Sequence, residues 1–244
     1  PPEDGAVVAN FDDDNVRRAV RDSNCRVLTC SKEKKADYYA DNISYNCMGF
    51  GEFDAYEFGR LLGRVKLSVA GAHNVSNAIC ALATARYLGL PFSGIAKGLI
   101  SYTGVCRRFE KKGEKNGVLV IDDYAHHPTE IRATLKTAKG MNVKNIYCVF
   151  QPHTYTRTNT LYPDFVSALS CGIQPILIDI YAAREKDTGL VNSRQLACDI
   201  DGAVYIDSFE KCAEYLKQNA KQGDLIITMG AGDVYKIGEM FLEI

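Results

Sequence analysis

The amino-acid sequence predicts an α/β protein whose second half forms a doubly wound, mainly parallel sheet. Three observations predict this class. From Val118 onward, apolar runs of strand length alternate five times with helix-like segments. Polar clusters follow the ends of these runs, which is where open α/β sheets bind their ligands. The chain has 244 residues, 46% of them hydrophobic, which is enough for one large core or two ordinary ones.

The elements of the second half can be read in order. Helix starts are indicated by proline in a first turn or by a serine N-cap, and helix ends by glycine. The predicted strands are 118–121, 145–150, 176–180, 203–206 and 225–228. The predicted helices are 128–139, one around 164–170, one from near Ser193, one capped by Ser208 and one from Asp233. Because a helix follows each strand, the strands are expected to run parallel.

The first half is less regular. Residues 6–10 are predicted as a strand, and the acids at 12–14 precede a helix whose positive N-terminus they favour, although three acids also suit a metal site. Short alternating segments between Cys25 and Val69 predict strands and hairpins. The next helix spans "GAHNVSNAICALATARYLGLP" and is predicted to bury Val75, Ala78, Ile79, Leu82 and Ala83. A domain boundary is expected between Tyr102 and Val105.

Composition argues against several functional classes. With 29 basic and 30 acidic residues the net charge is −1, so a nucleic-acid or anionic-membrane surface is not expected. No apolar run approaches the ~20 residues that a membrane span requires. The nine cysteines are scattered without CxxC spacing, which predicts reduced, mostly buried thiols. These observations favour a cytoplasmic protein with small-molecule partners.

Two polar pairs precede the second half. Asn74 and Asn77 lie three residues apart at a helix start, so both amides could contact a purine edge; alternatively, Asn74 caps the helix. Arg107 and Arg108 are expected on a strand and therefore on opposite faces. One of them could then reach a cleft, where a guanidinium suits phosphate oxygens, while the other is solvated.

The stretch 121–131, "IDDYAHHPTEI", holds the densest group of candidates. Asp122 and Asp123 follow a buried strand, a position suited to binding ribose hydroxyls, but paired acids are also common in ordinary loops. His126 and His127 are adjacent and so point in different directions, and no H-E-x-x-H motif supports a metal. A helix N-cap is the alternative for one of them. The segment "GAGD" lacks the third glycine of a dinucleotide motif, since Tyr235 occupies that position.

Taken together, six motifs in order resemble the Mur ligase family. They are "GAHNVSNA", "GVCRRFE", "IDDYAHHPTEI", "FQPHTYTRT", "DIYAARE" and "TMGAGDVYKIGEMF". The resemblance covers essentially the whole chain and implies part of a three-domain ligase. Residues 1–103 would be the C-terminal part of the central ATP-binding domain, a partial α/β domain. Residues 104–244 would be the C-terminal Rossmann-like domain, which closes on the other two.

The resemblance also implies an activity. The ligase would join L-alanine to UDP-N-acetylmuramic acid through an acyl phosphate, using ATP and Mg²⁺, in peptidoglycan precursor synthesis. The sequence has no G-x-x-x-x-G-K-[ST] loop. The phosphate loop and the magnesium ligands are therefore expected in a preceding part, with no metal site in this chain, and the chain alone is expected to be inactive. The alternatives are another Mur-type ligase, such as murein tripeptide ligase, or a noncatalytic nucleotide-binding module.

Nucleotide contacts carry over from the family motifs. By this resemblance Asn74 and Asn77 would hold the adenine of ATP, Asp123 the ribose and Arg108 the γ-phosphate. Arg108 would also act in catalysis, by offsetting negative charge that builds up during phosphoryl transfer.

Contacts to the amino-acid substrate carry over in the same way. Tyr124, His126, His153 and Arg157 would face L-alanine and the reacting centre, and His126 is the candidate general base for the alanine ammonium group. Arg157 is expected to meet His126 from the loop of a neighbouring strand. Thr154 stands where the family often has a second basic residue, so the way in which the alanine carboxylate is held stays open.

Overall fold

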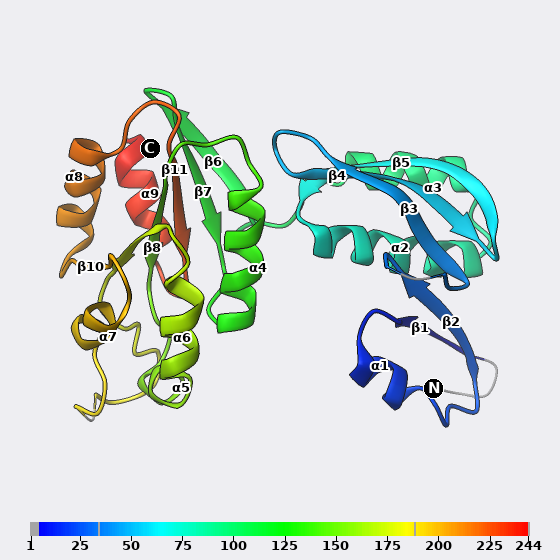
Figure 1. Cartoon of the computed structure of the whole chain (residues 1–244), viewed down its shortest axis with the longest axis horizontal. Helices are drawn as coiled ribbons and strands as arrows, with labels where there is room; N and C mark the ends of the chain where they lie inside the picture. The colour runs from blue at the N-terminus through cyan, green and yellow to red at the C-terminus, as the bar shows by residue number, and fades with distance from the viewer. Residues whose placement is uncertain (1–4, 34, 188, 244) are drawn as a thin grey trace. The chain divides into compact units, whose positions relative to one another are not determined.

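The computed structural model describes residues 5–33, 35–187 and 189–243. The chain divides into two units, of which the first ends at Gly104 and the second begins at Val105. Each unit has its own sheet (Figure 1). Each also has its own core of buried hydrophobic residues.

The first unit contains a five-stranded mixed sheet with the order β1-β2-β3-β4-β5. Its strands are β1 (Ala6–Asn10), β2 (Arg26–Ser31), β3 (Tyr38–Tyr45), β4 (Phe50–Glu57) and β5 (Arg60–Ala70). The pairs β1–β2 and β2–β3 are parallel, whereas β3–β4 and β4–β5 are antiparallel. The predicted strands and hairpins between Cys25 and Val69 are therefore present.

Three helices accompany this sheet: α1 (Asp14–Ala19), α2 (Ala72–Tyr87) and α3 (Phe92–Ser101). The Asp13 side chain accepts hydrogen bonds from the first backbone N–H groups of α1, so this acid of the 12–14 run caps a helix. Helix α2 buries the five predicted residues. Helix α3 was not predicted, because Gly94 and Gly98 weaken its helical propensity; it forms by packing on β5 and α2.

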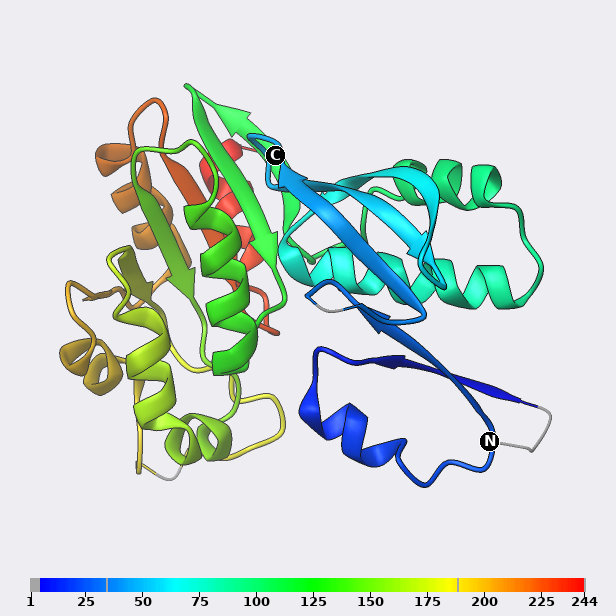
Figure 2. The same cartoon turned by 45° about the vertical axis from the view of Figure 1, so that its right-hand side comes forward.

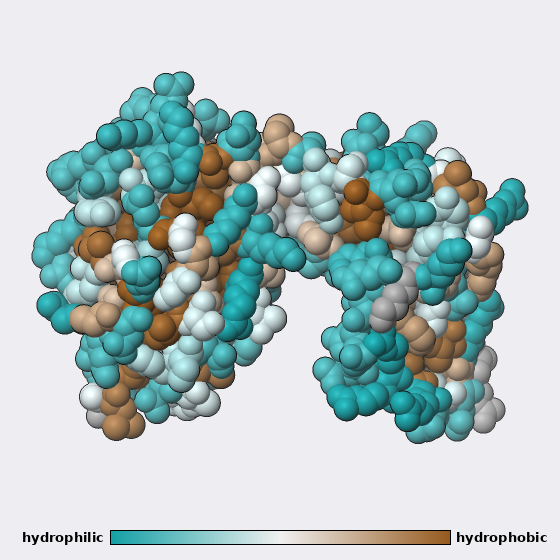
Figure 3. Space-filling model, viewed as in Figure 1, coloured by the Kyte–Doolittle hydropathy of each residue, from teal (hydrophilic) through white to brown (hydrophobic). Residues whose placement is uncertain are grey.

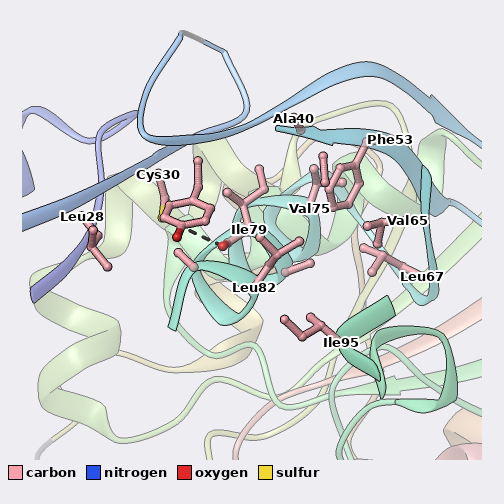
Figure 4. Close-up of a cluster of buried hydrophobic side chains, with 14 residues drawn as sticks. Leu28, Cys30, Ala40, Phe53, Val65, Leu67, Val75, Ile79, Leu82 and Ile95 are labelled. Carbon is pink, nitrogen blue, oxygen red and sulfur yellow. Dashed lines mark hydrogen bonds between the residues drawn. The ribbon is translucent and has the colours of Figure 1, made fainter. Parts of the chain in front are cut away.

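The core of the first unit lies between the sheet and α2. Phe53 and Val65 from the sheet and Val75 from α2 have no exposed surface. Figure 4 shows these side chains together, with Cys30 directed toward Ile79 of the helix, whose carbonyl accepts a weak hydrogen bond from the Cys30 thiol at 3.9 Å. Because α2 is anchored along its apolar face, its opposite face and its N-terminal turn are free to carry polar side chains.

The second unit contains a six-stranded sheet with the order β10-β9-β8-β11-β7-β6. The strands are β6 (Glu110–Lys115), β7 (Val118–Asp123), β8 (Ile146–Phe150), β9 (Gln174–Leu177), β10 (Val204–Tyr205) and β11 (Leu225–Met229). All neighbours are parallel except β6, which pairs antiparallel with β7. The predicted doubly wound, mainly parallel sheet is confirmed. The last strand in the sequence, β11, lies between β7 and β8.

Helices cover both faces of this sheet. They are α4 (Pro128–Lys139), α5 (Tyr155–Thr160), α6 (Tyr162–Leu169), α7 (Ser193–Asp199), α8 (Phe209–Asn219) and α9 (Tyr235–Leu242). Helix α4 contacts α6, and α6 contacts α7, whereas α8 contacts α9 and α9 packs on β6, β7 and β11. Figures 1 and 2 show α4 and α6 on one side of the sheet and α9 on the other. Alternate residues of β7, such as Val118 and Val120, join the core beneath α8 and α9.

Some predicted details are wrong. Strand β9 begins at Gln174 and ends at Leu177, earlier than predicted, although the Ile178 N–H still donates to the Phe150 carbonyl at 3.2 Å. Helix α9 begins two residues later than predicted, and α5 was not predicted. The nine cysteines are free, but the expectation that most are buried is wrong: three are buried, three half-buried and three exposed. The exposed ones lie on turns or on the outer face of a helix.

The face of the molecule seen in Figure 3 is mostly polar. In the view of Figure 3, hydrophilic residues cover most of the visible surface and hydrophobic residues show in small groups between them. Within the described residues, no helix is both long and apolar enough to cross a membrane.

Candidate functional site

The carboxyl ends of β7, β11 and β8 form the part of the second unit that we call the carboxyl edge (residues 122–127, 151–157 and 230–235). After β7 and β8 the chain passes to α4 and to α5 and α6, whereas after β11 it passes to α9 on the opposite face. The loop after β11 therefore leaves toward one face of the sheet, and the loops after its neighbours β7 and β8 leave toward the other. Doubly wound sheets bind ligands at such a point, outside the carboxyl ends of their strands.

Arg107, which precedes β6, contacts this edge through three side-chain hydrogen bonds. Its Nε donates to Asp122 Oδ2 at 2.8 Å, while its two Nη atoms donate to the carbonyls of Gly232 (2.8 Å) and Gly230 (2.7 Å). The guanidinium also lies over the Tyr124 ring, at 5.0 Å from its centroid. The Asp122 side chain is fully buried and that of Arg107 is 22% exposed, so the pair is largely desolvated.

The expectation that Arg107 and Arg108 lie on a strand is wrong. They lie in the turn before β6, and Arg107 has a φ of +60°. The Arg107 N–H donates to the Glu110 carboxylate and its carbonyl accepts from the Tyr124 N–H, both at 2.7 Å. These contacts hold a backbone conformation that costs about 1 kcal/mol or more for a residue with a side chain.

Arg108 differs from its neighbour. It is exposed, and its guanidinium lies over the Tyr124 ring, at 5.6 Å from the centroid. No carboxylate within the described residues forms an ion pair with Arg108. Arg107 is thus paired with a carboxylate, whereas Arg108 is available to bind an anion. The two arginines differ in this way although they lie in a turn and not on opposite faces of a strand.

Asp123 is almost buried, with 6% of its surface exposed. Its Oδ2 accepts from the Phe109 N–H and its Oδ1 from the Ala125 N–H, both at 2.8 Å. Burial raises the pKa of this carboxyl group, although the two N–H donors and the charge of Arg108 oppose that shift. Asp123 therefore fixes the turn between β7 and α4, and only its remaining lone pairs are left for a ligand.

The two histidines of "DDYAHHP" have different environments. His127 is the N-cap of α4: its Nδ1 accepts from the Thr129 N–H at 3.3 Å, and Glu130 completes a capping box. His126 is half-buried, and its Nδ1 lies 2.9 Å from the Tyr124 carbonyl oxygen. Because a carbonyl oxygen can only accept, Nδ1 carries the hydrogen and the lone pair of the neutral ring is on Nε2.

His153 lies beside His126 across the end of β11. Their ring centroids are 5.8 Å apart, and the His153 ring stacks on Tyr181 at 5.6 Å. Arg157 Nη1 donates to His153 Nδ1 at 3.2 Å, so the hydrogen of the neutral His153 ring is on Nε2. Burial lowers the pKa of His153, as do the positive charge of Arg157 and the proximity of the second imidazole, His126, while Glu185 opposes them.

The expected meeting of Arg157 with His126 is wrong in its detail. Strands β7 and β8 are not neighbours, because β11 lies between them. Arg157 contacts His153, and His153 in turn contacts His126. The three side chains are therefore brought together, but in a row.

Thr154 caps helix α5. Its side chain accepts from the Arg157 N–H at 3.4 Å, and its φ is +66°. Glu185 also binds this end of the helix, accepting from the Thr156 N–H at 2.8 Å. Neither Glu185 nor Tyr181 was predicted as a site residue, although both belong to the noticed motif "DIYAARE" and the motif alone could have indicated them.

The glycines of "GAGD" serve close packing. A Cβ atom on Gly232 would lie 2.3 Å from Gln151 Oε1 and 2.8 Å from Tyr181, and one on Gly230 would lie 2.7 Å from the Gln151 carbonyl oxygen. Glycine is therefore required at position 230, where a side chain would meet backbone, whereas a side chain at position 232 would require Gln151 and Tyr181 to move. This packing explains the glycines without a dinucleotide.

In the first unit, Asn74 and Asn77 share one face of α2. Asn77 Nδ2 donates to Asn74 Oδ1 at 3.1 Å, and Asn74 Nδ2 donates to the Ala70 carbonyl at 2.7 Å. The N-cap of α2 is Gly71, so the alternative that Asn74 caps this helix is wrong. Asn77 is exposed and can offer its carbonyl oxygen to a ligand.

The described residues contain no group of three or more His, Cys, Asp or Glu side chains that could hold a metal ion. The acids at 12–14, for which a metal site was the alternative, are used instead by the start of α1 and its surroundings: Asp13 caps the helix, and Asp12 accepts from the Lys32 N–H at 2.9 Å.

Two family models match the chain. The model "Mur ligase, glutamate ligase domain" matches residues 107–232, which is more than half of the chain, and "Mur ligase middle domain" matches residues 1–85. The chain belongs to the Mur ligase family.

Individual relatives agree with this assignment. The UDP-N-acetylmuramate–L-alanine ligase of Acetivibrio thermocellus is 50% identical over 99% of this chain and 53% of its own length. The ligase of the same name from Clostridium acetobutylicum is 48% identical over 99% and 54%. This chain thus spans about half the length of these relatives.

Solved structures share the fold. The UDP-N-acetylmuramate–alanine ligase of Thermotoga maritima superposes with a TM-score of 0.78 at 24% identity, covering 98% of this chain and 51% of that one. A murein peptide ligase from Psychrobacter arcticus gives a TM-score of 0.66 at 23% identity, covering 99% and 51%.

Proposed function

We propose that this chain is part of an ATP-dependent ligase that joins L-alanine to UDP-N-acetylmuramic acid in peptidoglycan precursor synthesis. The observation that carries the proposal is the row of His126, His153 and Arg157 over the end of β11, beside Arg108 and Tyr124. Relatives at 50% and 48% identity bear that ligase name and support the choice of substrates.

In this reaction the substrate carboxylate attacks the γ-phosphate of ATP, the bond between that phosphorus and the bridging oxygen breaks, and an acyl phosphate forms while ADP leaves. The alanine amine then attacks the acyl carbon, and inorganic phosphate leaves. Negative charge builds up on the phosphate oxygens in both steps, and an exposed, unpaired guanidinium is suited to offset it. We assign this role to Arg108, whose neighbour Arg107 is neutralised by Asp122.

The alanine ammonium group must lose a proton before its nitrogen can attack. His126 has the lone pair for this step on Nε2, because its Nδ1–H is donated to the Tyr124 carbonyl. His153 has the opposite tautomer, with Arg157 at its Nδ1, and can donate from Nε2 to an oxygen of the substrate. We therefore assign the general base to His126, and binding of the alanine carboxylate to Arg157 with His153.

The nucleotide contacts belong to the same proposal. Asn74 and Asn77 offer amide groups for the adenine, and Asp123 keeps lone pairs for the ribose hydroxyls. Mg²⁺ supplies charge neutralisation to ligases that use ATP. The described residues contain no group of three or more His, Cys, Asp or Glu side chains that could hold it, and we assign its binding to the part of the ligase that this chain does not span. We place the reaction in the cytoplasm, where ATP is available and where nine free thiols stay reduced.

The proposal is tested by the amino-acid dependence of phosphate release in the full-length ligase. With ATP, Mg²⁺ and UDP-N-acetylmuramic acid, we expect L-alanine to give a higher kcat/KM than glycine or L-serine, and a murein tripeptide to give no turnover. A preference for the tripeptide would assign the chain to murein tripeptide ligase. Phosphate release that is independent of any amino acid would contradict the ligase assignment.

The 244-residue chain alone should not catalyse the reaction, since it has no phosphate loop. The measurement is alanine-dependent phosphate release by the purified chain, with the full-length ligase as positive control. Turnover by the chain itself would show that its own residues activate ATP. A noncatalytic nucleotide-binding module would instead leave the full-length protein without turnover while ATP still bound.

A further inference from the structure

We propose that Arg107 is a positioning residue for the ligase reaction: it holds Tyr124 and the Gly230–Gly232 loop in place, and so fixes Arg108 at the carboxyl edge. The inference rests on the proposed function and adds to it a residue that contacts no substrate. It depends on the number, direction and burial of the contacts that Arg107 makes.

The guanidinium of Arg107 connects three segments that are distant in sequence. It binds Asp122 at the end of β7 and the carbonyls of Gly230 and Gly232 after β11. It also lies between two aromatic rings, at 5.0 Å from the centroid of Tyr124 and 4.9 Å from that of Tyr235. A planar fork with several N–H donors can satisfy these partners together, whereas an ammonium group cannot.

The loop after β11 depends on this anchor. On the β7 side of the loop, Arg107 donates to the carbonyls of Gly230 and Gly232, and the Gly230 N–H donates to the Asp123 carbonyl at 3.1 Å. On its β8 side, Gln151 packs against Gly232, but Gln151 Oε1 has no hydrogen-bond partner among the described residues. Among the described residues, the side-chain hydrogen bonds to the Gly230 and Gly232 carbonyls therefore come from Arg107.

The position of Arg108 depends on that of Arg107. The backbone of Arg107 is fixed at both its N–H and its carbonyl, and its φ of +60° sets the direction in which the next residue leaves. The guanidinium groups of both arginines contact the same Tyr124 ring. Without the Arg107 side chain, Tyr124 loses one of its two cationic neighbours, and Arg108 loses the fixed ring against which it rests.

The test is Arg107→Lys in the full-length ligase, because lysine keeps a positive charge near the buried Asp122. We expect kcat to fall roughly 10- to 100-fold with a rise in the KM for alanine, since small misplacements of reacting groups cost rates of this order. The matched control is Arg132→Lys on α4, whose exposed ion pair with Asp164 lies outside the site; its kinetics should stay within about twofold.

A second variant separates positioning from folding. Arg107→Ala removes the guanidinium, and added methylguanidinium should restore part of its turnover in a saturable manner. The same compound should have no effect on Arg132→Ala. Rescue without a change in the folded fraction, followed by circular dichroism, is the result that a purely structural role would not give.

Several outcomes would overturn the inference. A folded Arg107→Lys enzyme with kcat and KM within about twofold of the wild type would do so, as would failure of both variants to fold, or an Arg107→Ala loss that methylguanidinium does not relieve. Arg108→Lys separates this inference from the proposed function. If Arg108→Lys loses activity and Arg107→Lys does not, only the positioning role fails; if neither changes activity, the proposed site fails as well.

Discussion

Two clusters at the carboxyl edge of the second unit are built in contrasting ways. The β7 cluster (Arg107, Asp122, Asp123 and Tyr124) is held by a desolvated ion pair and by carboxylate oxygens that bind backbone N–H groups. The β8 cluster (His153, Arg157, Tyr181 and Glu185) is held by stacking of His153 on the exposed Tyr181 ring, by the hydrogen bond from Arg157 to His153, and by the Thr156 N–H that donates to Glu185.

The contrast suggests that the β7 cluster maintains the structure of the site and that the β8 cluster binds substrate. Groups that are buried and fully paired resist movement, because each lost partner leaves a desolvated charge or dipole behind. Groups that are partly exposed can exchange their partners for a substrate at lower cost. We therefore expect changes in the β7 cluster to reduce both stability and activity, and changes in the β8 cluster to reduce mainly activity.

The largest expected effect is on the stability of the second unit. Arg107→Ala leaves the Asp122 carboxylate fully buried without its ion-pair partner, so the free energy of unfolding should fall by about 3 to 5 kcal/mol. Urea denaturation of the 244-residue chain, followed by circular dichroism, measures this change. Arg132→Ala is the control: the Arg132 and Asp164 side chains are 45% and 58% exposed, and such pairs contribute about 0 to 1 kcal/mol. Equal losses in the two variants would remove the distinction between buried and exposed arginines.

Much of the fold could be predicted because its signals are local. Helix α4 has the predicted bounds, since Pro128 and Gly140 indicate its two ends. Helix α5 could not be predicted in this way: it has six residues and follows Thr154, whose positive φ the sequence does not indicate. Its capping contacts to Glu185 come from a segment about thirty residues further along the chain.

The geometry of the site was less predictable, because it depends on sheet order. Strand β11 is last in the sequence but lies between β7 and β8, so the sequence alone suggested a direct contact of Arg157 with His126. Arg107 was recognised as half of a pair, but its partner Gly232 lies 125 residues away. Contacts of this range follow from the tertiary fold and leave no local pattern.

The next effect concerns Arg157 and should appear in kinetics. If Arg157 binds the alanine carboxylate, Arg157→Ala in the full-length ligase removes a charge-assisted contact of about 1.5 to 3 kcal/mol, or roughly 10- to 150-fold in the KM for alanine. Arg157→Lys should recover only part of this, because an ammonium group is a single point charge. Thr154 offers no second cation, because its side chain is an uncharged hydroxyl that caps α5.

Stability provides the control for this variant. Because Arg157 belongs to the β8 cluster, the unfolding free energy of the Arg157→Ala chain should change by less than about 1 kcal/mol, in contrast to Arg107→Ala. Unchanged alanine and ATP kinetics in the full-length Arg157→Ala enzyme would remove this residue from the site. A loss in ATP dependence alone would move Arg157 from the amino acid to the nucleotide.

The smallest expected effect is on the titration of His153. The positive charge of Arg157 is one of the causes, after burial, that lower the pKa of His153 below its ordinary value of 6.5. Arg157→Ala should therefore raise the pKa of His153 toward that value, and NMR titration of the imidazole in the 244-residue chain measures the change. Arg132→Ala should leave it unchanged.

The same shift makes stability depend on pH. A histidine with a lowered pKa in the folded state binds protons more readily when the chain is unfolded, so its contribution to stability is complete above pH 6.5 and is lost as the pH falls through the folded-state pKa. The wild-type chain should lose more stability than Arg157→Ala between pH 7.5 and pH 5.5, because its His153 is shifted further. An unchanged or lower His153 pKa in Arg157→Ala would show that the two side chains do not interact as the 3.2 Å contact indicates. Arg157 and His153 would then not form the pair to which we assign the alanine carboxylate.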